Sequence, residues 1–402
     1  MDRAAFTDAA GALLECPASG NIRPYLSFVP APLPPLREAR AIGAVTALLS
    51  EADQAIGELV GIGRVLPNPD LLVRPYLRQE AVASSGIEGT QATFSDLVAF
   101  EASQSSPPGS DVRDVANYSS ALEQALRSVQ GGAAIDADLV RRIHRTLMTG
   151  ARGEVFSTPG EFRTIQNHIG GGREPADGDF VPPPPLEMHA ALDRLFLYLQ
   201  ADPTSRPPVL VEAAWVHYQF EAIHPFIDGN GRVGRVLIPL LIAQRRRFDH
   251  PLLYLSPYFR RNRTRYNDLL FAVSAQSAWE SWLRFFLEAV VERARSAIEL
   301  SDHLLGLGHT WHDQLDAVRA SQTAHKLADY VHQHIAISAG SAERHLGVTP
   351  PSVYNAVRVL ERAGILTEVT GRTRDRYWVA RDLLRLLDAD GYAASGPPPV
   401  AS

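Results

Sequence analysis

One short segment of the 402-residue chain concentrates the residues that could do chemistry. It reads HPFIDGNGRVGR, from His224 to Arg235, and lies between two stretches with helical apolar spacing. A loop before a helix offers free backbone N–H groups and the positive end of the helix dipole, and both attract phosphate. Gly229 and Gly231 lack side chains, so a phosphate group can approach the backbone there.

The side chains of this segment complete a site for a polyphosphate. Arg232 and Arg235 are three residues apart on the first turns of the expected helix, so their guanidinium groups point to neighbouring places. Asp228 supplies a hard oxygen ligand suited to a Mg²⁺ ion that keeps water and phosphate oxygens. His224 is the nearby group whose ordinary pKa suits a general base at neutral pH. The segment predicts a polyphosphate site with a base beside it.

Two other patterns overlap this segment. Gly229–Gly234 has the form G-x-G-x-x-G, and Asp249 follows 20 residues after Gly229, as in a dinucleotide-binding fingerprint. That fingerprint must follow a buried strand, whereas LVEAAWVHYQFEAI has helical spacing. A metal cluster of His217, His224 and Asp228 is also disfavoured, because a helix end separates the two histidines. We expect His217 to be a hydrogen-bonded helix residue.

The segment resembles the motif of the Fic-domain family, H-P-F-x-[DE]-G-N-G-R-x-x-R, at every fixed position. Fic proteins are helical enzymes, and most transfer AMP from ATP to a hydroxyl group of a target protein. The resemblance implies that His224 takes the proton from a Tyr, Thr or Ser hydroxyl, and that Asp228 holds Mg²⁺ between the α- and β-phosphates. The other phosphate-binding positions that it implies are Gly229, Asn230, Gly231, Arg232 and Arg235.

The resemblance also covers regulation. The segment SSGIEG, from Ser84 to Gly89, resembles the family's inhibitory pattern [ST]-x-x-x-E-[GN]. Because it precedes the motif in the chain, it implies the self-inhibited class with an N-terminal inhibitory helix. In that class Ser84 and Glu88 are inhibitory, and Glu88 pairs with Arg235 in the place of the γ-phosphate. ATP then binds with its α-phosphate misaligned for attack.

Two further sets of residues follow from the resemblance alone. Residues 160–172 stand where the family has its target-binding flap, a short β-hairpin. Its strand would consist of Asn167, His168, Ile169 and Gly170, to which an extended target segment can add through main-chain bonds. Tyr266 and Asn267 stand near the place of the adenine pocket.

The elements that must position these residues are mainly helical. Apolar residues recur at helical spacing in most of the chain. The expected helices span 41–65, 69–85, 111–130, 136–148, 184–200, 209–222, 234–245, 263–274 and 279–300. Strand signals are scarce before residue 360, apart from the possible hairpin at 161–172.

The C-terminal region has the order of a winged helix-turn-helix. Helices are expected at 325–337, 341–346 and 349–363, followed by strands at 366–370 and 376–380. The exposed positions of the third helix and the wing that could contact DNA are Ser352, Asn355, Arg358, Arg362, Arg372, Arg374 and Arg376. Glu361 and Asp375 weaken this interpretation, so a role in packing or protein contact stays open.

The predicted fold is therefore mainly α, with a helical Fic core, a short β-hairpin flap and a C-terminal winged helix-turn-helix. The expected divisions are an N-terminal helical region with the inhibitory helix at 1–105, a Fic domain at 106–290, a connecting helix at 291–320, the winged helix at 321–388 and a flexible tail at 389–402.

Composition limits the class of protein. Hydrophobic residues make up 45% and charged residues 21%, as in an ordinary globular protein. Lys+Arg 39 against Asp+Glu 45 gives a net charge of −6, which excludes a globally basic nucleic-acid coat. The single cysteine, Cys16, fits a reducing compartment. The apolar stretch 236–243 is far shorter than the roughly 20 residues that span a bilayer. We expect a cytoplasmic protein without membrane contact.

The sequence thus predicts a protein adenylyltransferase that is held inactive by Glu88, uses ATP and Mg²⁺, and modifies a target protein and itself. One alternative is a DNA-binding regulator whose Fic core senses nucleotide. Another is a Fic relative that uses a different nucleotide or removes AMP. The target, the modified residue and the formation of a homodimer stay open.

Overall fold

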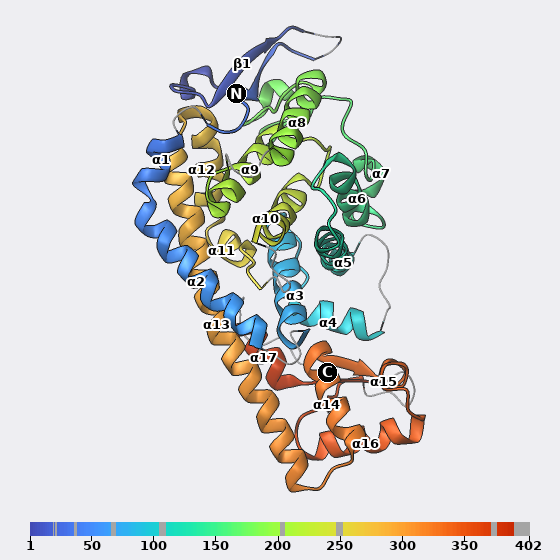
Figure 1. Cartoon of the computed structure of the whole chain (residues 1–402). Helices are drawn as coiled ribbons and strands as arrows, with labels where there is room; N and C mark the ends of the chain where they lie inside the picture. Colours follow the sequence, from blue (N-terminus) through green and yellow to red (C-terminus); the bar gives the residue numbers. More distant parts are fainter. Residues whose placement is uncertain are drawn as a thin grey trace.

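The computed structural model describes residues 1–389 except 19, 21, 36–37, 66–69, 104–109, 202–205, 247–251 and 371–375. The described chain is mainly α, as predicted, with small antiparallel sheets near each end (Figure 1). The expected start of a helix at Asn68-Pro69 and the tail beyond residue 389 lie outside these residues.

Two helices joined by the motif loop form the centre of the molecule, α9 (Val209–Ile223) and α10 (Asn230–Arg246). Nearly every residue of α9 is buried, from Leu210 to Ile223, as expected for a helix that other elements enclose on all sides. Around this pair lie α5 (Asp111–Gln130), α6 (Ala137–Met148) and α8 (Pro185–Gln200), each within about two residues of its predicted bounds. Asp136 caps α6 by accepting the Leu139 N–H at 2.9 Å.

One helix runs along most of the molecule. It is α13 (Trp279–Ala317), which continues without a break from the helix expected at 279–300 through most of the connecting helix expected at 291–320. The apolar spacing continues through Leu304, Trp311 and Leu315, all of which are buried. On one side it packs against α2 (Thr46–Val65), which α1 (Glu38–Ala44) precedes.

The helix that carries the inhibitory pattern is α3 (Asp70–Ile87). It packs against α5, against α11 (Ser256–Arg261) and against α14 (Gln322–His334) of the C-terminal part. It leads into α4 (Phe94–Ser103). Helix α3 therefore contacts both the Fic core and the C-terminal part of the chain.

The N-terminal segment forms an antiparallel hairpin that the sequence analysis missed. Its strands are β1 (Gly11–Cys16) and β2 (Tyr25–Pro30), paired from Gly11 opposite Pro30 to Cys16 opposite Tyr25. The scarcity of strand signals before residue 360 was thus misleading. The hairpin depends on tertiary contacts, because Phe28 is fully buried and its N–H donates to the Val181 carbonyl at 2.8 Å.

The C-terminal elements follow the predicted order, with two additions. The helices α14, α15 (Ala339–Leu346) and α16 (Pro350–Arg362) are followed by β4 (Thr367–Glu368) and β5 (Tyr377–Val379). The additions are β3 (Ala336–Ser338), which pairs with β5, and α17 (Arg381–Ala389). The prediction of a helix to residue 337 was wrong, because Ile335 takes a positive φ of 67° and ends it.

The expected hairpin at 161–172 is reduced to a single antiparallel bridge, which joins Ile169 to Phe180. The remaining helices are α7 (Glu154–Ser157) and α12 (Arg263–Gln276), with short 3-10 turns at Arg3–Ala5 and Pro175–Asp177. Among the described residues, no helix is both long enough and apolar enough to cross a membrane.

Candidate active site

His224 ends α9 in a left-handed conformation, with φ 51° and ψ 61°. This conformation is uncommon for a residue other than glycine and is typical of functional sites held by their surroundings. The Nδ1 atom lies 3.3 Å from the Glu221 carbonyl oxygen. Because a carbonyl only accepts, Nδ1 carries the proton and Nε2 is left as the acceptor. Burial, followed by the charge of Arg163, lowers the pKa of His224 to about 4. The ring is therefore neutral at pH 7.

Side chains from α10 and from the segment 161–169 hold the loop after His224. Asn230 accepts the Phe226 N–H and donates to the Phe226 carbonyl, both at 2.8 Å. Arg163 donates from Nε to the His224 carbonyl and from its backbone N–H to the Pro225 carbonyl, both at 2.9 Å. Asn167 donates to the Phe226 carbonyl at 2.8 Å. The segment 161–169 and the motif loop are thus one hydrogen-bonded unit.

His144 on α6 is a supporting residue that the sequence analysis missed. The backbone N–H of Gly160 donates to its Nδ1 at 2.8 Å, so Nε2 carries the proton and donates to the Asp228 carbonyl at 3.0 Å. Its ring stacks on Phe226, with centroids 3.7 Å apart. Burial lowers the pKa of His144 to about 4. The available signal was its position on the buried face of α6, between Ile143 and Leu147.

The Asp228 side chain is 55% exposed. Its Oδ1 accepts the Gly229 N–H at 2.6 Å, and Gly153, with φ 89°, leaves space beside Oδ2. An exposed carboxylate next to a phosphate-binding loop suits Mg²⁺, which takes most of its ligands from phosphate and water. No group of three or more His, Cys, Asp or Glu side chains that could hold a metal occurs within the described part of the chain. His217 lies in the core, where its Nε2 is 2.7 Å from the Tyr266 hydroxyl.

The two motif arginines are both buried but have different partners. Arg232 lies between Asp228 at 3.7 Å and Asp114 at 4.0 Å, and it donates to the Met148 sulfur at 3.3 Å. Arg235 donates from Nε to the Ser84 hydroxyl at 2.8 Å, and from Nη2 to the Ser84 carbonyl at 3.1 Å and to Glu88 Oε1 at 2.6 Å. The end of α3 therefore lies on the first turn of α10.

The Glu88–Arg235 pair is fully ionised at neutral pH. Burial alone would raise the pKa of Glu88, but the charge and hydrogen bond of Arg235 outweigh it, and the net shift is downward. Burial alone would lower the pKa of Arg235, and the charge of Glu88 raises it instead. Gly231 permits the approach, because a Cβ atom there would lie 2.3 Å from Glu88 Oε1.

The residues predicted for the adenine pocket and for the flap have different surroundings. Tyr266 is 2% exposed and belongs to the aromatic core, whereas Asn267 beside it is exposed, so the two do not face one space. In the flap segment, Ile169 is 41% exposed, His168 bonds the Gly172 carbonyl through Nε2, and Gly170 has φ 67°.

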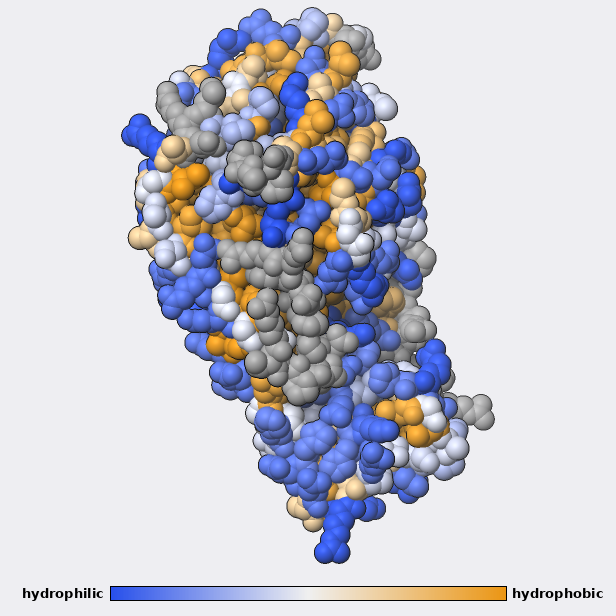
Figure 2. All heavy atoms as spheres, in the orientation of Figure 1, coloured by the Kyte–Doolittle hydropathy of each residue, from blue (hydrophilic) through white to orange (hydrophobic). Residues whose placement is uncertain are grey.

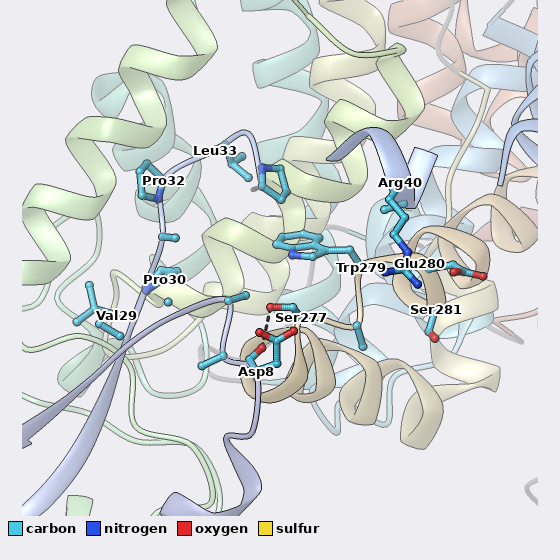
Figure 3. Close-up of a pocket in the computed structure, with 18 residues that line it drawn as sticks. Asp8, Val29, Pro30, Pro32, Leu33, Arg40, Ser277, Trp279, Glu280 and Ser281 are labelled. Atoms are coloured by element: carbon cyan, nitrogen blue, oxygen red, sulfur yellow. Dashed lines mark hydrogen bonds between the residues drawn. The ribbon is translucent and has the colours of Figure 1, made fainter. Parts of the chain in front are cut away.

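A hollow in another part of the molecule contains none of the motif residues (Figure 3). It lies between the N-terminal hairpin and the start of α13, with Trp279 at its centre and Arg40 and Glu280 on one side. The Ser277 hydroxyl donates to the Asp8 carbonyl there at 2.7 Å. This contact joins the N-terminal segment to the helices.

In the C-terminal part, the residues predicted to contact DNA have mixed surroundings. Asn355, Arg358 and Arg362 are exposed, and on the face shown in Figure 2 hydrophilic side chains cover most of this part. Arg376 instead packs over the rings of Tyr354 and Trp378. Arg372 and Arg374 lie outside the described residues.

Family models match two parts of the chain. Residues 46–127 match the Fic/DOC family N-terminal region, and residues 134–242 match the Fic/DOC family itself. The chain therefore contains a Fic/DOC domain. The second match contains the whole motif loop, and the first contains Ser84 and Glu88.

Proteins with a similar sequence include two named protein adenylyltransferase Fic. The one from Drosophila yakuba is 28% identical over 171 residues, and the one from Drosophila melanogaster is 26% identical over 171 residues. Each match covers 41% of this chain and 32% of the relative, so the chain matches about a third of the length of these relatives.

Solved structures show the same fold. A Fic family protein from Desulfovibrio desulfuricans G20 superposes with a TM-score of 0.54 at 18% identity, covering 84% of this chain and 95% of that one. Fic-1 from C. elegans gives a TM-score of 0.52 at 21% identity, covering 66% and 76% of the two chains. The helical Fic fold is therefore confirmed.

The lowered pKa of His144 predicts that the free energy of unfolding decreases as the pH falls from 7 to 5. Between pH 7 and pH 5 the unfolded chain gains a proton on this histidine while the folded chain does not, which costs about 2 kcal/mol. His144→Phe keeps a ring against Phe226 and removes the titration. Denaturant unfolding at the two pH values should show a smaller loss for this variant than for the wild type.

The exposed His309 is the matched control, and His309→Phe should leave the pH dependence unchanged. An equal loss of stability in His144→Phe and the wild type would contradict the neutral, buried state assigned to His144.

Proposed function

We propose that this chain is a protein adenylyltransferase that transfers AMP from ATP to a Tyr, Thr or Ser hydroxyl of a target protein, and that Glu88 holds it inactive. The observation that carries the proposal is the presence of a neutral base, a carboxylate and two guanidinium groups around the N-terminal end of α10. The names of the relatives in Drosophila support the same chemistry.

The phosphates of ATP bind at the N-terminus of α10, where the backbone from Gly229 to Gly231 and the two arginines supply positive charge. Magnesium held by Asp228 would supply further charge neutralisation there. The hydrogen bond from Nδ1–H to the Glu221 carbonyl keeps His224 in one tautomer, so Nε2 faces the reaction as an acceptor.

The transfer forms one bond to the α-phosphorus and breaks another. His224 Nε2 takes the proton of the target hydroxyl while the hydroxyl oxygen forms a bond to the α-phosphorus. The bond from the α-phosphorus to the bridging oxygen breaks, and pyrophosphate leaves. His224 contributes fully at neutral pH, because its lowered pKa of about 4 keeps the ring unprotonated.

The target chain binds next to the flap residues Asn167–Gly170 in this proposal. Asn167 and Arg163 hold this segment against the motif loop, so a hydroxyl on a bound target segment lies near His224. Ile169 already pairs with Phe180 on one edge, and it is 41% exposed. An extended target segment can pair with the backbone on the other side of this segment.

Autoinhibition follows from the partners of Arg235. While its Nη2 is bonded to Glu88 at 2.6 Å, the guanidinium is not available to the γ-phosphate. The triphosphate must then bind in another position, and an error of about 1 Å at the reacting atoms can cost on the order of 100-fold in rate.

Glu88→Gly should raise self-modification by about 10- to 100-fold, because it removes the carboxylate and adds no bulk. The measurement is incorporation of label from ATP that carries it on the α-phosphate, with γ-labelled ATP and the other nucleoside triphosphates in parallel. Glu58→Ala, which removes an exposed carboxylate of α2, should behave like the wild type. No gain in Glu88→Gly with any nucleotide would sink the proposal.

His224→Ala, made in the Glu88→Gly background, should lower transfer by at least about 100-fold, because it removes the Nε2 acceptor to which the proposal assigns the proton. The affinity for ATP, measured by calorimetry, should change little, since the phosphate contacts lie on the residues that follow. Transfer that survives in this double variant would show that His224 is not the base.

Asp228→Ala in the same background should raise the Mg²⁺ concentration needed for half-maximal transfer by about tenfold or more. The physical reason is that the carboxylate supplies the protein ligand of the ion. Asp193→Ala, on the exposed face of α8, is the control. An unchanged Mg²⁺ titration would remove Asp228 from the metal site.

A further inference from the structure

The inward side of α3 and of the turn that follows it carries three polar side chains at intervals of four residues, Glu80, Ser84 and Glu88. Residues at this spacing lie on one side of a helix. Ser84 and Glu88 contact Arg235, as described above. Glu80 lies two turns before Glu88, about 12 Å along the helix axis, and has a different set of partners.

The carboxylate of Glu80 is buried, with 2% of the residue exposed. Its Oε1 accepts the hydroxyl protons of Tyr118 on α5, at 3.0 Å, and of Ser256 on α11. Its Oε2 accepts the backbone N–H of Ser256 at 3.0 Å. Three donors from two other elements therefore converge on one buried carboxylate.

These hydrogen bonds hold the Glu80 carboxylate in one position. A buried carboxylate is costly unless its donors are in place, so a shift or rotation of α3 that separates Glu80 from them is strongly opposed. The Glu88 side chain, in contrast, is 41% exposed. Water can therefore solvate the Glu88 carboxylate when it leaves Arg235, which it cannot do for the carboxylate of Glu80.

We propose that Glu80 is a positioning residue for the inhibitory pair. Its bonds to Tyr118 and Ser256 fix α3 at the height and rotation at which Ser84 and Glu88 meet Arg235. The effect on transfer rests on the proposed function, whereas the effect on α3 itself does not. Loss of Glu80 releases the inhibitory end of α3 without changing any residue that contacts Arg235.

The first measurement is hydrogen exchange of the backbone amides at 82–87 in the full chain. Glu80→Ala should speed this exchange by about tenfold, because a buried charged hydrogen-bond network is lost. Glu212→Ala is the matched control, since Glu212 is equally buried but pairs with Arg206 and Arg245, far along the chain from α3. It should leave exchange in α3 unchanged.

The second measurement is self-modification with α-labelled ATP. Glu80→Ala should raise it by about tenfold over the wild type, and Glu212→Ala should not. Adding Glu80→Ala to Glu88→Gly should give no further increase, because the inhibitory carboxylate is already gone. A purely structural role would instead lower transfer in that double variant.

Tyr118→Phe removes one donor to Glu80 and little volume, so it replaces Glu80→Ala in both measurements if that variant does not fold. It should shift exchange and labelling in the same direction by a smaller factor. Unchanged exchange in both variants would overturn the proposal, and it would indicate that α3 is held from its other face. If Glu88→Gly itself gives no label, the proposed function fails, while the exchange data still decide the role of Glu80.

Discussion

The guanidinium of Arg235 is the group on which the arrangement of this molecule depends. It is 2% exposed and lies on the second turn of the central helix α10, where a buried positive charge requires an anionic or strongly polar partner. In this structure Ser84 and Glu88 of α3 are the partners. A molecule that replaces Glu88 must bring its own negative charge to the same place, as the triphosphate would in the proposed function.

The same requirement links distant parts of the chain. Helix α3 meets α5 and α11 through Glu80 and α10 through Ser84. Arg78 and Gln79 donate instead to the carbonyls of Gln333 and Leu387 in the C-terminal elements, at 3.0 Å and 2.8 Å. The helix that precedes Glu88 is thus in contact with both the Fic core and the C-terminal part (Figure 1).

The sequence was sufficient for the features that depend on local pattern. The bounds of α5, α6, α8 and α9 followed from apolar spacing and caps, and the residues from His224 to Arg235 converge because they share one loop and one helix turn. Contacts between distant segments were harder. The pairing of Arg235 with Glu88 was expected only from the family resemblance, and the β1–β2 hairpin exists because Phe28 fits into a core built from later residues. His144 and Glu80 escaped notice because their role is to hold other elements, which no local pattern records.

The most direct test of the account is the position of the triphosphate in the full chain. Structures of the wild type and of Glu88→Gly should be determined with Mg²⁺ and an ATP analogue that cannot transfer its nucleotide. The account predicts that in Glu88→Gly the γ-phosphate bonds Arg235 and the α-phosphorus faces His224 Nε2, whereas in the wild type Glu88 keeps Arg235 and the α-phosphate is turned away. The same phosphate position in both structures, or a triphosphate bound away from Arg235, would contradict it.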